Sequence, residues 1–154
     1  NKLRRLSLKI KCTSISPSIL ASGHFDGFHS GHLDYLKQAM EYRKKVICIV
    51  SSDKQLLMKR GKVNIPETER RDIVGTILRG LGADYSIFIN KYDNGTATVT
   101  EALHHFKPSI FLRGYDKKPK TMPEAERWMC EKLSIKVLYA KNRIGERHSS
   151  EIFK

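Results

Sequence analysis

Apolar residues along the chain occur in two patterns, short continuous runs and helical repeats. The continuous runs are rich in β-branched and aromatic residues and have the length of buried strands. They are Ser18–Ala21, Val46–Val50, Tyr85–Ile89, Ser109–Leu112 and Ile135–Ala140. Because a helical repeat separates each run from the next, the pattern predicts an α/β fold, in which a five-stranded, mostly parallel sheet carries helices on both faces.

The helical repeats place apolar side chains three and four residues apart, on one face of each predicted helix. In chain order these faces hold Leu33, Leu36, Ala39 and Met40; Ile73, Val74, Ile77 and Leu81; Val99, Ala102, Leu103 and Phe106; and Ala125, Trp128, Met129 and Leu133. Pro66 and Pro123 stand where the second and fourth helices are expected to begin. A short terminal helix is expected at Ser149–Phe153.

The 154 residues are the length of one domain, and no repeat or linker divides them. We divide the chain into a basic N-terminal segment, residues 1–17, and one Rossmann-like domain, residues 18–154. Two interpretations of the first segment remain open. Leu6, Leu8 and Ile10 alternate with polar residues, as in an edge strand, and a basic segment without acids is also typical of a targeting sequence.

The chain carries 29 Lys and Arg against 16 Asp and Glu, a formal net charge of +13. Such an excess favours anionic partners: nucleic acid, acidic lipid or small phosphorylated ligands. No apolar run reaches the length of a membrane-spanning helix, so we expect no membrane span. Cys12, Cys48 and Cys130 lack the spacing of a zinc or redox motif, which favours a reducing, cytoplasmic compartment, or an organelle if the first segment is a targeting remnant.

Candidate chemistry is concentrated between the first strand and the first helix, where residues 23–32 read G-H-F-D-G-F-H-S-G-H. Ligands of parallel sheets bind beyond the carboxyl ends of the strands, and a helix N-terminus there offers N–H groups to phosphate. Glycine allows the backbone to approach a ligand closely, and His29 and His32 can direct two rings at one phosphate. Two alternatives are open: an ordinary role as a helix cap or surface residue for a single histidine, and a zinc site, for which no third ligand is evident.

This string resembles the G-x-F-D-x-x-H-x-G-H signature of the cytidylyltransferase-like nucleotidyltransferases, which include heptose-1-phosphate adenylyltransferase and glycerol-3-phosphate cytidylyltransferase. The resemblance extends from Ser18 to Phe153. It implies the nucleotidyltransferase fold and a reaction in which an acceptor oxygen attacks the α-phosphorus of a nucleoside triphosphate and pyrophosphate leaves. It also implies Mg²⁺ as cofactor, carried by the triphosphate rather than by a protein metal site.

Matched by motif position, the resemblance implies site residues along most of the chain. The catalytic set is His29, His32, Lys59 and Arg70, with Arg71 as the second match to the family's arginine. Nucleotide contacts are implied for Gly23, His24, Phe25, Asp26, Gly31, Arg113, Gly114, Asp116, Arg143, Ser149 and Ser150. The loop of residues 58–64, which contains Lys59, is expected to be mobile and to fold over the phosphates.

Structural interpretations stand beside these roles. Asp26 is expected to fix the turn or to help with the metal rather than to act as a base. Ser149 and Ser150 also suit a helix N-cap, Arg70 and Arg71 a solvated helix face, and Lys59 an ordinary charged loop. The last motif departs from the family pattern, since His148 stands at the expected first serine, so the identity of the base does not carry over.

The sequence therefore predicts an enzyme that transfers a nucleoside monophosphate to a small phosphorylated acceptor such as a sugar or polyol phosphate. The segment from Arg113 to Asp116 looks closer to the sugar-phosphate adenylyltransferases, which favours ATP over CTP. Two alternatives remain, a basic nucleic-acid-binding protein and an inactive nucleotide-binding relative. No specific nucleic acid partner is expected, because the charge is scattered and no aromatic RNA motif occurs, and a homodimer is left open.

Overall fold

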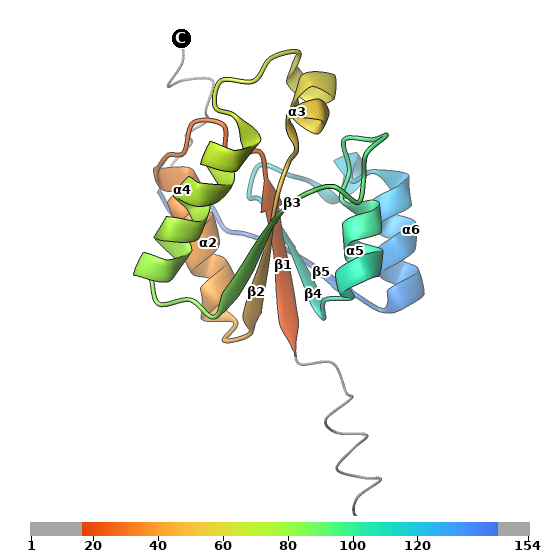
Figure 1. Cartoon of the computed structure of the whole chain (residues 1–154). Helices are drawn as coiled ribbons and strands as arrows, with labels where there is room; N and C mark the ends of the chain where they lie inside the picture. The colour runs from red at the N-terminus through yellow and green to blue at the C-terminus, as the bar shows by residue number, and fades with distance from the viewer. Residues whose placement is uncertain (1–16, 145–154) are drawn as a thin grey trace, which may run out of the picture.

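The computed structural model describes residues 17–144, which form a five-stranded sheet between two layers of helices (Figure 1). The strands are β1 (Ser18–Gly23), β2 (Lys45–Val50), β3 (Tyr85–Ile89), β4 (Ile110–Arg113) and β5 (Lys136–Tyr139). Their order in the sheet is β3-β2-β1-β4-β5, and every neighbouring pair is parallel. The predicted fold class is confirmed, and each strand lies within about two residues of its predicted position.

The strands are apolar on both faces because helices cover both faces of the sheet. In β2 the side chains alternate: Val46, Cys48 and Val50 belong to one core, and Ile47 and Ile49 to the other. Successive side chains of a strand point to opposite faces, so a continuous apolar run of this length serves two cores at once.

Within residues 17–144, four helices cover the sheet, two on each face. Residues of α2 (Ser30–Glu41) and α4 (Glu67–Gly80) pack in the first core, and residues of α5 (Thr100–Phe106) and α6 (Glu124–Leu133) pack in the second. Two short elements, α3 (Asp53–Arg60) and the 3₁₀ helix η1 (Pro119–Thr121), stand apart from these layers. Figure 1 shows α3 beyond the carboxyl ends of the strands. No helix among the described residues is long and apolar enough to cross a membrane.

Two sequence expectations need correction. The predicted apolar face of α6 is rotated: Trp128 is 57% exposed, with the Lys132 ammonium 4.8 Å from its ring centre, whereas Glu126 is buried. The expected loop around Lys59 is wrong at its start, because residues 58–60 form the last turn of α3, which ends at Gly61 in the left-handed conformation (φ 76°). The segment of residues 1–16 and the helix expected at Ser149–Phe153 lie outside the described residues.

The chain crosses from β3 to α5 in a loop that buried polar side chains hold in place. Asp93 accepts hydrogen bonds from the backbone N–H groups of Glu101 (2.8 Å) and Ala102 (3.2 Å), at the N-terminus of α5. Gln55 of α3 donates to three backbone carbonyls of the loop, at 2.9–3.2 Å. Asp93 thus caps α5 from outside the helix, and Gln55 fixes α3 to the same loop.

We expect Asp93→Ala to lower the free energy of unfolding by roughly 2–4 kcal/mol, because it removes the cap of α5 and leaves buried donors unpaired. The exposed Asp84 provides the control, and Asp84→Ala should change the same quantity by less than about 0.5 kcal/mol. Urea unfolding of the two variants measures the difference. Equal stability of the two variants would show that Asp93 does not hold the loop.

Candidate active site

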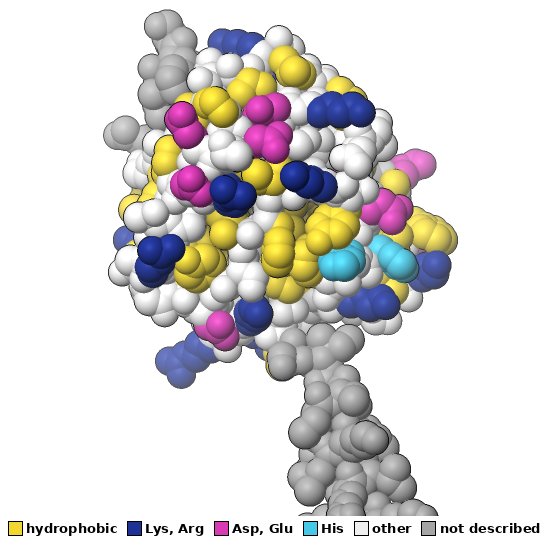
Figure 2. Space-filling model, in the orientation of Figure 1, with side chains coloured by type: hydrophobic (Ala, Val, Ile, Leu, Met, Phe, Trp, Pro, Cys, Tyr) yellow, Lys and Arg dark blue, Asp and Glu magenta, His cyan; other side chains and the backbone are white. Residues whose placement is uncertain are grey.

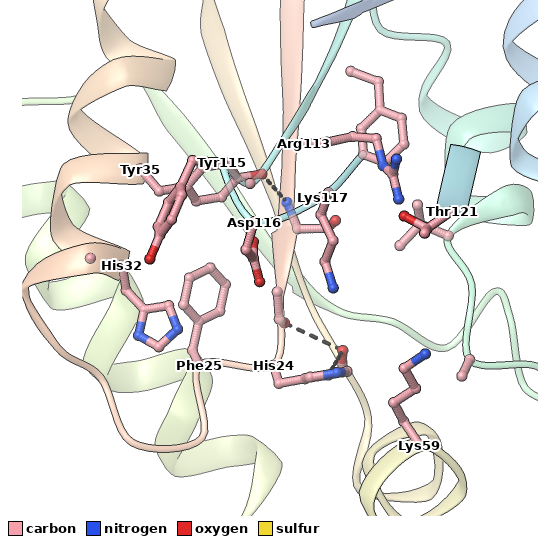
Figure 3. A pocket seen from close by; sticks show the side chains of 18 of the residues that line it. His24, Phe25, His32, Tyr35, Lys59, Arg113, Tyr115, Asp116, Lys117 and Thr121 are labelled. Atoms are coloured by element: carbon pink, nitrogen blue, oxygen red, sulfur yellow. Dashed lines mark hydrogen bonds between the residues drawn. The ribbon is translucent and has the colours of Figure 1, made fainter. Parts of the chain in front are cut away.

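A cavity of about 330 Å³ opens at the carboxyl ends of β1 and β4, where the chain switches from one side of the sheet to the other (Figure 3). It brings together residues that are up to 104 positions apart, from Ser22 to Glu126. Ten residues that the sequence singled out line it: Gly23, His24, Phe25, His29, Gly31, His32, Lys59, Arg113, Gly114 and Asp116. The cavity is therefore the candidate active site.

Arg70, a buried residue of α4, holds the turn that follows β1 through hydrogen bonds. The guanidinium of Arg70 donates to the backbone oxygens of His24 (2.9 Å), Ser51 (2.6 Å) and Ile65 (2.7 Å), and to the carboxylate of Asp53 (2.7 Å). Its side chain is fully buried. The role expected for Arg70 as a substrate donor is thus corrected: four hydrogen bonds to the protein make it a positioning residue.

Asp26 closes the same turn. Its carboxylate accepts hydrogen bonds from the backbone N–H groups of Asn64 (3.0 Å) and Ile65 (2.7 Å), and the residue is 2% exposed. It therefore fixes the turn and does not line the cavity. Phe25 adopts a left-handed conformation (φ 52°), and a side chain at Gly23 would come within 3.0 Å of the Phe25 ring.

The two signature histidines are oriented by the N-terminus of α2. His29 is the N-cap residue, and its Nδ1 accepts a hydrogen bond from the backbone N–H of Gly31 at 3.0 Å. The Nδ1 of His32 accepts from the backbone N–H of His29 at 3.2 Å, and the two rings stack with centroids 3.9 Å apart. Because Nδ1 is the acceptor in both rings, the proton of each neutral imidazole resides on Nε2.

The opposite wall of the cavity is cationic. Lys59 and Arg60 extend from the last turn of α3, and Lys117 comes from the segment after β4. Ser52 caps α3 by accepting a hydrogen bond from the backbone N–H of Gln55 at 3.1 Å, so the helix and its cations are anchored. Figure 3 shows Lys59 and Lys117 directed toward the space between them.

His24 lies between the two walls, with its Nδ1 2.7 Å from the hydroxyl of Ser51. The pKa of His24 is lowered to about 4, first by burial and then by the charges of Arg60, Lys117, Arg70 and Lys59, in that order of size. The ring is therefore neutral near pH 7. A neutral imidazole can occupy this cationic site without adding to its charge.

The segment after β4 forms the far side of the cavity. Arg113 donates to the backbone oxygen of Lys118 (3.0 Å) and to the hydroxyl of Tyr139 (3.1 Å), and its guanidinium carbon lies 5.5 Å from the Tyr139 ring centre. A side chain at Gly114 would come within 2.8 Å of the carboxylate of the exposed Asp116, which would then have to move. The contacts with Lys118 and Tyr139 hold Arg113 at the cavity wall.

Arg143, another predicted nucleotide contact, does not line the cavity in the described part of the chain. It binds Asp34 and Glu41 on the outer side of α2, at 2.6 Å each. The nucleotide contact expected for Arg143 stays a prediction, which would require the guanidinium to exchange these two carboxylates for the ligand. Ser149 and Ser150 lie outside the described residues.

Sequence reasoning missed Glu126, a buried carboxylate in the cavity wall. It is 6% exposed, and its Oε2 accepts a hydrogen bond from the backbone N–H of Val99 at 3.0 Å. Burial raises its pKa. A signal was present, since Glu126 precedes Met129, Cys130 and Leu133 by three, four and seven residues and so shares their buried face.

We looked among the described residues for side chains that could bind a metal ion without help from a ligand. Among residues 17–144 no group of three or more His, Cys, Asp or Glu side chains is placed to hold a metal ion. The exposed carboxylate of Asp116 lines the cavity. A single carboxylate suits an ion such as Mg²⁺ that arrives with phosphate ligands of its own.

The sequence resembles known proteins over most of its length. The model of the cytidylyltransferase-like family matches residues 20–153. A FAD synthase of Methanohalobium evestigatum is 30% identical over 112 residues, which are 72% of this chain and 68% of that protein. The bifunctional protein HldE of Vibrio atlanticus is 29% identical over 121 residues, which are 78% of this chain but 24% of that protein, so this chain matches about a quarter of HldE.

Solved structures share the fold. A lipopolysaccharide core biosynthesis protein of Thermoplasma volcanium superposes with a TM-score of 0.62 at 23% identity, over 83% of this chain and 98% of that one. A pantoate-beta-alanine ligase of Francisella tularensis superposes with a TM-score of 0.63 at 14% identity, over 95% of this chain and 69% of that one. At these identities the likeness shows the fold alone.

We expect Arg70→Met to lower the free energy of unfolding by roughly 3–5 kcal/mol, because it leaves carbonyls and a carboxylate without their buried donor. Arg71→Met is the matched control, since the neighbouring Arg71 side chain is 40% exposed and should tolerate the change. Chemical unfolding measures both variants. Normal stability of Arg70→Met together with lost activity would instead assign Arg70 to the substrate.

The environment of His24 predicts that stability depends on pH. The unfolded chain takes up a proton at His24 near pH 6.5, but the folded protein does so only near 4, so the free energy of unfolding falls as the pH drops through this interval. We expect His24→Asn to remove up to about 3 kcal/mol of this loss. The control is His104→Asn on the surface, and identical pH profiles of the two variants would contradict the prediction.

Proposed function

The chain belongs to the cytidylyltransferase-like family, and on that premise we propose that it transfers a nucleoside monophosphate from ATP or CTP to a small phosphorylated acceptor. Membership indicates an enzyme of the nucleotidyltransferase type, and pyrophosphate would be the second product. A sugar or polyol phosphate is the proposed acceptor. The relatives named FAD synthase and HldE support the reaction class and leave the acceptor to be determined.

The stacked pair His29 and His32 is the observation that carries this proposal. Their rings stand at the N-terminus of α2, where the helix itself favours an anion, and both line the cavity. Lys59, Arg60 and Lys117 face the same space. A triphosphate bound here would lie between two imidazoles on one side and three cations on the other.

In the proposed reaction an ionised oxygen of the acceptor phosphate forms a bond to the α-phosphorus, and the bond from that phosphorus to the pyrophosphate oxygen breaks. The attacking oxygen is already deprotonated near neutral pH, so no general base is required. Catalysis then consists of positioning the two anions and stabilising charge on the α-phosphoryl group and the leaving pyrophosphate. The imidazole Nε2 groups would stabilise charge on the α-phosphoryl group, and Lys59 with Arg60 would stabilise charge on the leaving pyrophosphate.

Mg²⁺ carried by the triphosphate would supply additional neutralisation of charge. Asp116 is the exposed carboxylate of the cavity and would share the ion with the phosphates. We favour ATP as donor, because the segment from Arg113 to Asp116 resembles that of adenylyltransferases and one relative is named for the synthesis of FAD, an adenine dinucleotide.

A nucleic-acid-binding role receives no comparable support. On the face seen in Figure 2, Lys and Arg side chains are scattered among acidic, apolar and uncharged groups and do not form a stripe. A nucleic-acid footprint would gather them along one groove.

The direct test is a screen for pyrophosphate release, with each of four nucleoside triphosphates and Mg²⁺ against a panel of phosphorylated acceptors. We expect release that requires both a triphosphate and an acceptor. The absence of release with every pair, combined with no shift in melting temperature from any triphosphate, would refute the proposed function.

We expect His29→Asn and His32→Ala each to lower kcat by about 10²–10³, because each removes a preorganised donor to the transition state. Asparagine at position 29 retains a capping side chain, so the melting temperature should change little. His104→Asn, on the surface of α5, is the control. Near-normal turnover of the double variant would exclude these histidines from catalysis.

A further inference from the structure

We infer that Glu126 accepts a hydrogen bond from a hydroxyl group of the acceptor, and that the enzyme thereby selects a hydroxyl-rich sugar or polyol phosphate over a flavin phosphate. This inference rests on the proposed function. It goes further by naming a residue that distinguishes acceptor classes, a position to which the family signature assigns no role.

The location of Glu126 places it at the acceptor end of the cavity. It comes from the first turn of α6, whereas His29 and His32 come from α2, and these helices cover opposite faces of the sheet (Figure 1). The cavity extends from one to the other around the ends of β1 and β4. If the triphosphate occupies the side of the histidines, the remaining side, next to α6, receives the acceptor.

The bonding of Glu126 is incomplete for a buried carboxylate. Oε2 accepts from the backbone N–H of Val99, and among residues 17–144 no other hydrogen bond reaches this carboxylate and no ion pair includes it. The residue is 94% buried, on a helix face whose other members are apolar. Carboxylate oxygens accept several hydrogen bonds, and leaving that capacity unused in a buried site is costly. A hydroxyl donor from a ligand would complete its bonding.

Arg113 fixes the orientation of such an acceptor. Its guanidinium interacts electrostatically with Glu126 and lines the same cavity, and Figure 3 shows it near Thr121, on the side of the cavity away from His32. The acceptor phosphate would be drawn toward Arg113 and Lys117, and thus toward the triphosphate. Its hydroxyl groups would extend toward Glu126 and Thr121.

The same wall is poorly suited to a flavin. A flavin ring is a flat, three-ring system, and sites for such groups are lined mainly by apolar and aromatic side chains. Besides Val99, which binds Glu126, the apolar lining of the cavity includes Ala97, Phe111 and Pro123, and Phe111 is 2% exposed, so it offers little surface for stacking. A buried carboxylate facing an apolar ring would lose hydration without a partner.

The test compares acceptors in the wild-type enzyme and in two variants. The acceptors are a set of aldose 1-phosphates, their monodeoxy analogues, glycerol 3-phosphate and FMN, each assayed for pyrophosphate release with ATP and Mg²⁺. We expect a hydroxylated sugar or polyol phosphate to be preferred over FMN. Removal of the hydroxyl that Glu126 binds should lower kcat/KM by roughly 10- to 100-fold.

Glu126→Gln is close in shape and still accepts a hydrogen bond from Val99, but it removes the charge. It should raise the KM of the acceptor by roughly 10-fold or more, leave the KM of ATP unchanged, and reduce the discrimination against the deoxy analogue. Glu124→Gln, exposed in the same helical turn, is the control and should behave as wild type.

The outcomes separate the two proposals. FMN as the best acceptor, or equal discrimination against the deoxy analogue by wild type and Glu126→Gln, would overturn the role of Glu126 and leave the nucleotidyl transfer intact. Pyrophosphate release with none of the acceptors and none of the four triphosphates would refute the proposed function, and the inference with it. The deoxy comparison in the wild-type enzyme tests hydroxyl recognition even if the variant fails to fold.

Discussion

The buried guanidinium of Arg70 is the interaction on which the geometry of the site depends. It joins three segments that are distant in the sequence, through the backbone oxygens of His24, Ser51 and Ile65. These segments carry the signature turn, the end of β2 and the approach to α4. Donors in a charged, planar fork can hold three carbonyls in fixed relative positions, which no apolar side chain could do. Arg70 thus fixes the turn that leads to the histidines, and it fixes Ser51 beside His24. Through Asp53 it also holds the start of α3, the helix that carries the cations.

The resulting cavity combines two environments that suit two different anions. On the α2 side, stacked imidazoles and a helix N-terminus line the same cavity as the cations of α3, an arrangement fitted to a polyphosphate. On the α6 side, Arg113 stands beside the buried Glu126, which fits an anion that also bears hydrogen-bond donors. Neutral His24 lies between them. The two substrates would meet where the strand order reverses, at the ends of β1 and β4.

The sheet and the signature could be predicted from sequence because each has a strong local cause. The run Val46–Val50 must be buried on both faces, and the signature string places its histidines at a helix N-terminus. Helix α3 could not be predicted, because Leu57 and Met58 are about half exposed and the helix has no apolar repeat. The burial of Arg70 depends on carbonyl groups contributed by distant segments. Helix α6 exposes Trp128 and buries Glu126 because Glu126 faces the cavity that this helix borders. Both features, the burial of Arg70 and the orientation of α6, arise from tertiary contacts, which a local sequence pattern does not reveal.

The central claim is that the α-phosphorus of a nucleoside triphosphate is transferred at this cavity. Its most direct test uses ATP labelled at the α-phosphorus in one sample and at the γ-phosphorus in another, each incubated with Mg²⁺ and the preferred acceptor. Attack at the α-phosphorus moves the α label into the acceptor product and leaves the γ label in pyrophosphate. Recovery of the γ label in the acceptor or as free inorganic phosphate, with the α label retained in ADP, would identify attack at the γ-phosphorus and contradict the account.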